Sequence, residues 1–458
     1  MARIDTLTNY LTDIATAIKT KKGDNTPILA SNFDTEIANL PSGGGGGAEP
    51  EEKDVNFYDY DGTRLYSYTT GDFLNLSSMP ENPTHSGLTS QGWNWTLSNA
   101  KTYVSNYGEL DIGQLYITDD GKTRIYIELD EYSLNPTLGF SSNGSVTIDW
   151  GDGNTSTKSG SSLTTILTIA HTYSEPGNYM ITLYSSSSIR ISGTGYGSKL
   201  LTLNNSSDNY VNDIYLSKVK KIEIGARTSL NTMALNTLYN LETISIPSGM
   251  TTNGNYTFGA CYSLKGLVLP SSITAINQQD FSNCVNLKHI CLPNITYIGQ
   301  SGFSSCSTLK RICVSNVTNG GNSAFNGCTN LKEINLPHYT SSTTSMFSGC
   351  TILEKVKIDS MSTIPNSLFS NCRCLTIVNI PNVTSVGNLV FSNCFSLRYI
   401  YFIENTSVPT LSNTNTFSSI ANTNYKIVVP DDLYTEWRSA TNWSNSNIVN
   451  HIIRESDV

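Results

Sequence analysis

The chain has 458 residues, which is too long for one ordinary hydrophobic core, so we expect two to four domains. Only 14% of the residues are charged and the net charge is -9, which argues against a nucleic-acid-binding protein because such proteins need a basic surface. The sequence has no run of 18 apolar residues, so we expect no membrane insertion through a transmembrane helix.

Residues 1–42 predict a short helical anchor with one apolar seam. The seam residues are spaced three and four apart; they are Ile4, Leu7, Leu11, Ile14 and Ile18. A helix of two heptads is too short to be stable alone, so we expect it to be buried in a homo-oligomer. Isoleucine at both core positions of the heptad favours coiled coils of three or more helices, and we therefore favour a trimer. The alternative is that this helix packs on the apolar residues of 31–40 in its own chain.

Five glycines at 43–47 begin a flexible linker that spans residues 43–52 and marks a domain boundary. The block before them resembles the start of structural proteins from tailed phages and prophages of Gram-positive hosts. The residues that carry this likeness are Ile4–Leu7, Ile14–Gly23, Asn32–Phe33 and Ile37–Pro41. The resemblance implies attachment to other virion tail or baseplate proteins, followed by a hinge and a distal binding module.

Residues 53–114 predict a small mixed module. Asp61-Gly62 lies between two aromatic runs, which is typical of a tight hairpin turn, and a helix is expected from about Leu97 to Tyr107. Trp93 and Trp95 lie two residues apart and would share one face of a strand. Exposed, they could stack on a sugar ring; buried, they would form the core of the module, which we favour. Three motifs occur in the order Asp59-Tyr-Asp-Gly62, Pro83-x-His85 and Gln91-Gly-Trp-Asn-Trp95. This order also resembles a module of the same phage tail proteins.

Residues 115–195 alternate apolar and polar residues, as in paired strands. We expect the apolar residues of 115–117 and 125–129 to pair across the Asp120-Gly121 turn. The motifs Trp150-Gly-Asp-Gly153 and His171-Thr-Tyr, followed by Pro-Gly-x-Tyr179, resemble the PKD (polycystic kidney disease) domain. The resemblance implies an immunoglobulin-like β-sandwich with Trp150 in the core and Tyr179 packed opposite it. Asp149 and Asp152 could form a carboxylate pair or hold calcium, but we favour turn chemistry, because Asp and Gly are typical of such turns.

Residues 196–430 contain repeats of 22 or 23 residues with the anchor Phe-x-x-Cys-x-x-Leu. The repeated phenylalanines are Phe258, Phe281, Phe303, Phe325, Phe347, Phe369 and Phe391. A fixed period of this length is typical of a solenoid, in which stacked units bury a continuous core. The pattern resembles the BspA-like (Treponema-type) leucine-rich repeat, and each unit should supply one strand to a parallel sheet. Residues 431–458, with Trp437 and Trp443, predict a helical cap over the last coil.

Seven of the ten cysteines occupy one repeat position and should point into the core as free thiols. Cys291 and Cys313 fall on outward strand positions and are expected to be accessible. Free thiols are typical of proteins that fold in a reducing cytoplasm, so we expect this chain to be assembled there. The motifs of a nucleophile, a phosphate loop or a zinc site do not occur, so we expect neither an enzyme nor a bound metal or cofactor.

The outward strand positions vary from unit to unit, so the fold does not dictate them, and they are candidates for partner binding. The candidates are His289, Arg311, Lys355, Lys357, Tyr399 and Tyr401. Such a mixture of cations and aromatic rings could bind an anionic or sugar-rich polymer. The alternatives are the opposite loops and the cap around Trp437 and Trp443.

The predicted fold is mainly β: a helical anchor, a small module, a PKD-like sandwich and a leucine-rich-repeat solenoid. In an oligomer, several flexibly tethered solenoids could bind one surface at once, which raises the overall avidity. Together with the N-terminal resemblance, this predicts a phage tail protein, a receptor-binding fibre that recognises a host cell-surface glycan or protein. It would be located in the virion and assembled in the host cytoplasm, since no signal peptide is visible. The alternatives are a BspA-like adhesin of the bacterial surface and a purely structural virion decoration.

Overall fold

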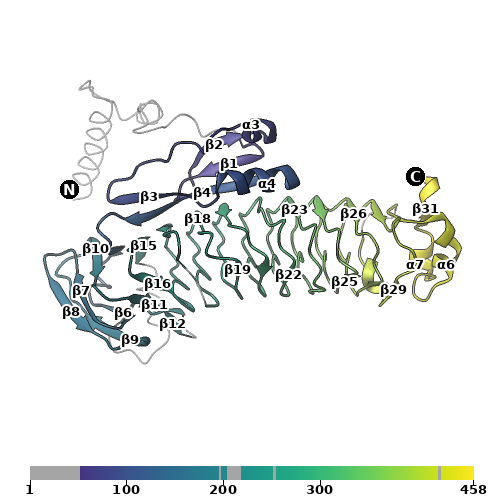
Figure 1. The fold of residues 1–458 in the computed structure, drawn as a ribbon. Coiled ribbons are helices and arrows are strands. Elements are labelled where there is room, and N and C mark those ends of the chain that lie inside the picture. Colours follow the sequence, from purple (N-terminus) through teal and green to yellow (C-terminus); the bar gives the residue numbers. More distant parts are fainter. Residues whose placement is uncertain (1–51, 195–196, 204–217, 251–253, 421–423) are drawn as a thin grey trace, which may run out of the picture. The chain divides into compact units, whose positions relative to one another are not determined.

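The computed structural model describes residues 52–194, 197–203, 218–250, 254–420 and 424–458 (Figure 1). The chain divides into two compact units, residues 1–52 and 53–458. The described residues begin at Glu52, so the seam from Ile4 to Ile18 and the five glycines of the linker lie outside them. The oligomer that the seam predicts stays a prediction. None of the described helices is both long and apolar enough to cross a lipid bilayer.

The first part of the second unit, residues 53–118, is a four-stranded sheet with two helices, hereafter the module. Its elements are β1 (Val55–Tyr58), β2 (Arg64–Tyr68), α3 (Thr70–Leu74), β3 (Leu88–Trp93), α4 (Leu97–Tyr107) and β4 (Leu110–Thr118). The strand order is β2-β1-β4-β3, and only the central pair is parallel. Thr96 caps α4 by accepting a hydrogen bond from the Asn99 backbone, and Gly108 ends the helix in a left-handed conformation.

Two β-sheets follow the module. Their strands are β5 (Thr123–Leu129), β6 (Pro136–Ser142), β7 (Ser145–Asp149), β8 (Thr155–Ser159), β9 (Ser162–Ala170), β10 (Gly177–Tyr184), β11 (Ile189–Ile191), β14 (Leu201–Leu203), β15 (Val219–Glu223), β16 (Thr228–Leu230) and β17 (Thr243–Ser245). One sheet has the order β17-β15-β5-β10-β7-β8, and the other has the order β14-β6-β11-β16 with β9 on β6. A separate hairpin joins β12 (Gly193–Thr194) to β13 (Gly197–Ser198).

The expected pairing of residues 115–117 with 125–129 is wrong. Residues 115–117 belong to β4, which pairs inside the module, whereas β5 pairs with β10 and β15. Trp150 is fully buried as expected, but the ring stacked on it is His171, at 4.5 Å, while Tyr179 packs on Tyr173. The Asp152 carboxylate accepts a hydrogen bond from the Asn154 backbone N–H and contacts His171 Nε2 at 2.7 Å. These contacts stabilise the turn, as turn chemistry predicts.

The repeats form a solenoid with two rows of short parallel strands (Figure 1). The first row continues β17 with β18 (Gly266–Val268), β20 (His289–Cys291), β23 (Glu333–Asn335), β24 (Lys355–Lys357), β26 (Ile377–Asn379), β28 (Tyr399–Tyr401), β30 (Lys426–Val429) and β31 (Ile452–Arg454). The second row has β19 (Ala275–Ile276), β21 (Tyr297–Ile298), β22 (Asn319–Gly320), β25 (Thr363–Ile364), β27 (Ser385–Val386) and β29 (Thr410–Leu411). Hydrogen-bonded pairing is broken within both rows, so each is a series of short ladders.

Phenylalanine rings stack along the solenoid interior. Successive rings from Phe258 to Phe417 lie 5.1–5.9 Å apart between centroids, with interplanar angles of at most 17°. The chain turns sharply around each ring; Ser323 and Gly327, two residues before and after Phe325, both have positive φ. The backbone N–H of Phe325 donates to Met346 in the next coil, so the turns are also hydrogen-bonded along the stack.

The core cysteines are hydrogen-bond donors as well as small apolar side chains. In each of six coils, the thiol donates to the phenylalanine carbonyl of the preceding coil at 3.0–3.2 Å, as Cys328 does to Phe303. The same carbonyl accepts the backbone N–H of its own coil's cysteine. Both acceptor positions are therefore filled, which explains why cysteine suits this buried site.

All ten cysteines are free, and the expected accessibility of Cys291 and Cys313 is wrong. Their side chains are 1% and 9% exposed because the module covers them. Only Cys374 is not buried.

We expect a maleimide to label Cys374 alone in the folded protein, with all ten thiols reacting after denaturation. Burial raises the pKa of the core thiols, for example that of Cys328 to about 12, so little reactive thiolate forms at neutral pH. Mass spectrometry of the labelled peptides would test this. Native labelling of Cys291 or Cys313 would show that the module does not cover these thiols.

The last coil is closed by short helices. They are η2 (Thr414–Phe417), η3 (Asp431–Leu433), α6 (Tyr434–Ser439), α7 (Ser446–Val449) and η4 (Glu455–Asp457). Trp437 and Trp443 are fully buried and pack on Phe402, so the candidate cap tryptophans are core residues and not a binding surface.

Candidate functional site

The module lies on the first row of strands and covers part of the face predicted to bind a partner (Figure 1). Gly113 on β4 packs so closely that a Cβ placed there would lie 2.4 Å from a Val268 methyl. Asn94 donates to the backbone carbonyls of Leu269 and Cys291, both at 3.1 Å. These contacts fix the module over the coils of β18 and β20.

Arg311 holds the module by charge. Its guanidinium lies 3.3 Å from Asp111 Oδ1 and 3.4 Å from Glu109 Oε2, and it donates to the carbonyls of Lys53 and Asp54. Only 13% of the Arg311 side chain and 3% of that of Asp111 are exposed. Burial alone would lower the pKa of Arg311, but Asp111, Cys313 and Glu109 raise it above its ordinary value. Arg311 is therefore a buried, permanently charged anchor and not a ligand-binding residue.

His289 is also withdrawn from the predicted surface. Its ring stacks on Tyr58 of the module with centroids 4.5 Å apart. The six candidate residues thus divide in two: His289 and Arg311 lie under the module, whereas Lys355, Lys357, Tyr399 and Tyr401 lie beyond it.

The uncovered part of the strand row, from β23 to β28, is hereafter the open face. Lys355 and Lys357 have side chains 79% and 62% exposed, and Ile377, between the lysines and the tyrosines, is 50% exposed. Tyr399 and Tyr401 stack with centroids 5.7 Å apart and remain partly exposed. The lysines pair with Glu333 at 3.7 Å and Asp359 at 3.4 Å, and exposed pairs of this kind hold a side chain only weakly.

A groove of about 360 Å³ marks the boundary between the open face and the module. Asp54, Gly108 and Glu109 form its module side, and β23 and β24 form its solenoid side. Burial raises the pKa of Glu109, although Arg311 opposes that shift. The groove therefore joins an acidic wall to the two lysines, and a partner lying on the open face would meet charges of both signs at this end.

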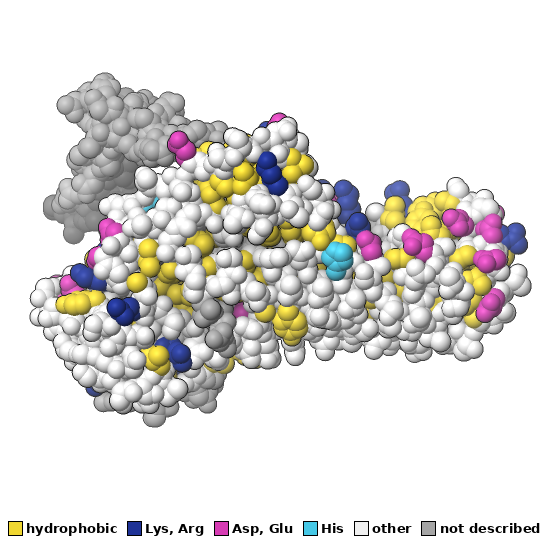
Figure 2. Space-filling view, viewed as in Figure 1, with side chains coloured by type: hydrophobic (Ala, Val, Ile, Leu, Met, Phe, Trp, Pro, Cys, Tyr) yellow, Lys and Arg dark blue, Asp and Glu magenta, His cyan; other side chains and the backbone are white. Residues whose placement is uncertain are grey.

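Charged side chains are sparse over the rest of the visible surface, where uncharged polar groups and backbone predominate (Figure 2). Among the described residues, no group of three or more His, Cys, Asp or Glu side chains is placed to hold a metal ion. The open face presents two stacked tyrosine rings, an exposed isoleucine and two exposed lysines.

The fold defines the class, a leucine-rich-repeat solenoid with part of one strand row exposed. Residues 214–320 and 312–424 match the family model described as BspA type Leucine rich repeat region, in six copies. The repeat region is therefore a BspA-type leucine-rich-repeat array.

Several solved structures are similar to part of this chain. A leucine-rich repeat protein from Bacteroides ovatus is 24% identical over 52% of this chain and 65% of its own length, with a TM-score of 0.40, so this chain spans less than two thirds of that protein. The Treponema pallidum leucine-rich repeat protein is 24% identical over 46% of this chain and 83% of its own, with a TM-score of 0.31. A leucine rich cell surface protein from Faecalibacterium prausnitzii is 15% identical over 56% of this chain and 92% of its own length, with a TM-score of 0.25. No curated protein matches the chain.

Proposed function

We propose that this chain is an adhesin-like surface protein that binds a glycan or protein of another cell through the open face. The observation that supports this most is the division of the strand row. The module buries Gly266, Val268 and Cys291 on β18 and β20. It leaves the lysines and the isoleucine of β24 and β26 exposed and the tyrosines of β28 partly exposed. Aromatic side chains such as Tyr399 and Tyr401 are enriched at protein interfaces.

The BspA-type repeats support a binding role, because a stack of coils presents a continuous, varied surface on an invariant core. Of the three expectations formed from the sequence, the bacterial surface adhesin fits this repeat type at least as well as the phage tail fibre. We retain the tail protein as a second candidate because the N-terminal block resembles phage structural proteins. A homotrimer, virion attachment and a host receptor belong to that second proposal.

Replacing Lys355, Lys357, Tyr399 and Tyr401 together by alanine should lower cell binding at least tenfold, because it removes both cations and both stacked rings. The measurement is flow cytometry of the fluorescent protein on a panel of bacterial and epithelial cells. A matched control removes two exposed lysines and two exposed tyrosines from other repeat positions: Lys288, Lys310, Tyr262 and Tyr297. Equal binding by the open-face variant and the wild type would reject the proposed surface.

The two candidates differ in where the chain is found. Antibody raised against residues 53–458 should label intact bacterial cells if the protein is a surface adhesin. Immuno-electron microscopy that finds the label on tailed virions instead would favour the tail protein.

A further inference from the structure

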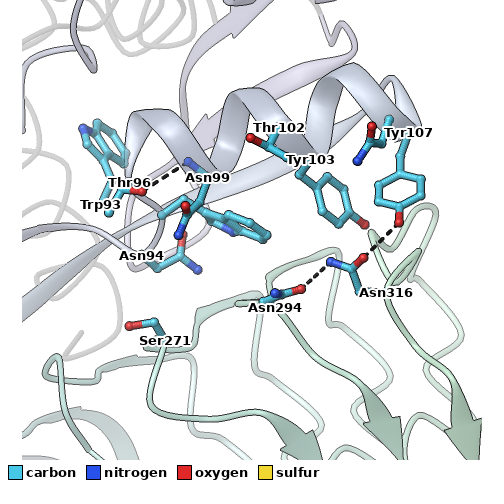
Figure 3. A pocket seen from close by; sticks show the side chains of 12 residues that line it. Trp93, Asn94, Thr96, Asn99, Thr102, Tyr103, Tyr107, Ser271, Asn294 and Asn316 are labelled. Atoms are coloured by element: carbon cyan, nitrogen blue, oxygen red, sulfur yellow. Dashed lines mark hydrogen bonds between the residues drawn. The ribbon is translucent and has the colours of Figure 1, made fainter.

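A second groove lies on the module side of the solenoid, between helix α4 and the turns that follow β18 and β20 (Figure 3). Its volume is about 440 Å³, within the range of small-molecule sites. We refer to it as the α4 groove. It is separate from the open face. Its lining includes Trp93 and Trp95, which the sequence singled out as a sugar-stacking pair or as module core, and none of the outward strand positions.

Three aromatic residues of the module hold the two walls at a fixed separation. Trp95 Nε1 donates to the Leu292 carbonyl at 3.0 Å, and Tyr103 Oη accepts from the Ser315 backbone N–H at 3.0 Å. Tyr107 Oη donates to Asn316 Oδ1, also at 3.0 Å. The groove is therefore formed in advance by hydrogen bonds along its length, which lowers the entropic cost of binding a ligand.

The lining is neutral throughout. It consists of aromatic rings, amides and hydroxyls and contains no Asp, Glu, Lys, Arg or His side chain. Trp95, Tyr103 and Tyr107 follow one another with centroids 5.2 and 4.7 Å apart, and Trp95 and Tyr107 keep part of their surface exposed. An anionic polymer would find no cation here, so the lining does not suit a phosphate- or carboxylate-bearing ligand.

Unused amides face the aromatic row. Asn99 and Asn106 project from α4, are exposed, and make no side-chain hydrogen bond to any other described residue. On the opposite wall, Asn294 and Asn316 are already joined to each other, as Figure 3 shows, and Ser271 adds an exposed hydroxyl. An amide offers two donors and an acceptor, which is the set that paired sugar hydroxyls require.

We propose that the α4 groove binds a neutral oligosaccharide. The apolar C–H face of a pyranose ring would lie on the exposed parts of Trp95 and Tyr107, and its hydroxyls would be bound by the amides of Asn99 and Asn106. Aromatic side chains supply large, rigid contact areas, while the amides fix the orientation of the sugar. The site acts independently of the open face.

The test is an array of neutral and acidic oligosaccharides probed with the complete chain, followed by calorimetric titration of the strongest binder. We expect binding to neutral members only. Replacing Asn99 and Asn106 by alanine should weaken it at least tenfold, and Asn99→Trp, which fills the groove from an exposed position, should abolish it. The matched control replaces two exposed asparagines elsewhere, Asn82 and Asn447, and should bind as the wild type does.

Three results would overturn the proposal: no binding on the array, binding confined to acidic members, or unchanged affinity in both groove variants. The open-face variant separates the two proposals, because it should keep full affinity for the oligosaccharide. Its loss of sugar binding would instead assign the sugar to the open face.

Discussion

Replacing Phe325 by alanine should lower the free energy of unfolding by about 3–5 kcal/mol, the usual cost of emptying a phenylalanine site in a core. Phe325 is fully buried between Phe303 at 5.5 Å and Phe347 at 5.8 Å. The missing ring removes two stacking contacts and leaves a cavity that the rigid coil backbone cannot close. Urea denaturation followed by circular dichroism would measure the change.

The loss should also be local, because each coil of a solenoid is stabilised by its neighbours. Hydrogen exchange should accelerate most in the coils of Phe303, Phe325 and Phe347. Phe395→Ala is the matched control, since that side chain is 41% exposed and should cost less than about 1 kcal/mol. A change of similar size in both variants would contradict the stacked-core account.

Arg311→Ala should destabilise the contact between module and solenoid by about 3–5 kcal/mol, the usual cost of breaking a buried ion pair. Asp111 would remain almost fully buried without its cation, and the carbonyls of Lys53 and Asp54 would lose their donor. We expect the module to open more often and to expose Cys291 and Cys313. The measurement is the rate of maleimide labelling at these two cysteines.

Cys350 provides the internal reference, because it lies in the core away from the module and should stay protected. Lys310→Ala is the control for losing an exposed cation in the adjacent position. Adding Asp111→Asn and Glu109→Gln to Arg311→Ala should restore part of the protection, since the charges left unpaired are then removed. Unchanged labelling in Arg311→Ala would show that Arg311 does not hold the module.

The sequence carries part of the signal for the contact between module and solenoid. The outward strand positions of the early coils hold Gly266, Val268, Cys291 and Cys313, which are small or apolar. Those of later coils hold Lys355, Lys357, Asn379 and tyrosines. Small and apolar residues at exposed positions indicate a covered surface. The signal is partial, because His289 and Arg311 also lie at covered positions and the apolar Ile377 lies at an exposed one. It also does not say what covers the first half.

The amino-acid sequence by itself determined the solenoid and its core. A period of 22 or 23 residues places every Phe, Cys and Leu in register, because a stack of identical coils can bury its apolar positions in only one way. Free, buried thiols followed from the same register. Only the tertiary structure decided which outward residues remain available, because that depends on contacts between residues up to 258 positions apart, such as Arg311 with Lys53. Local spacing carries no information on such contacts, since they arise from the shapes and charges of two surfaces after each has folded.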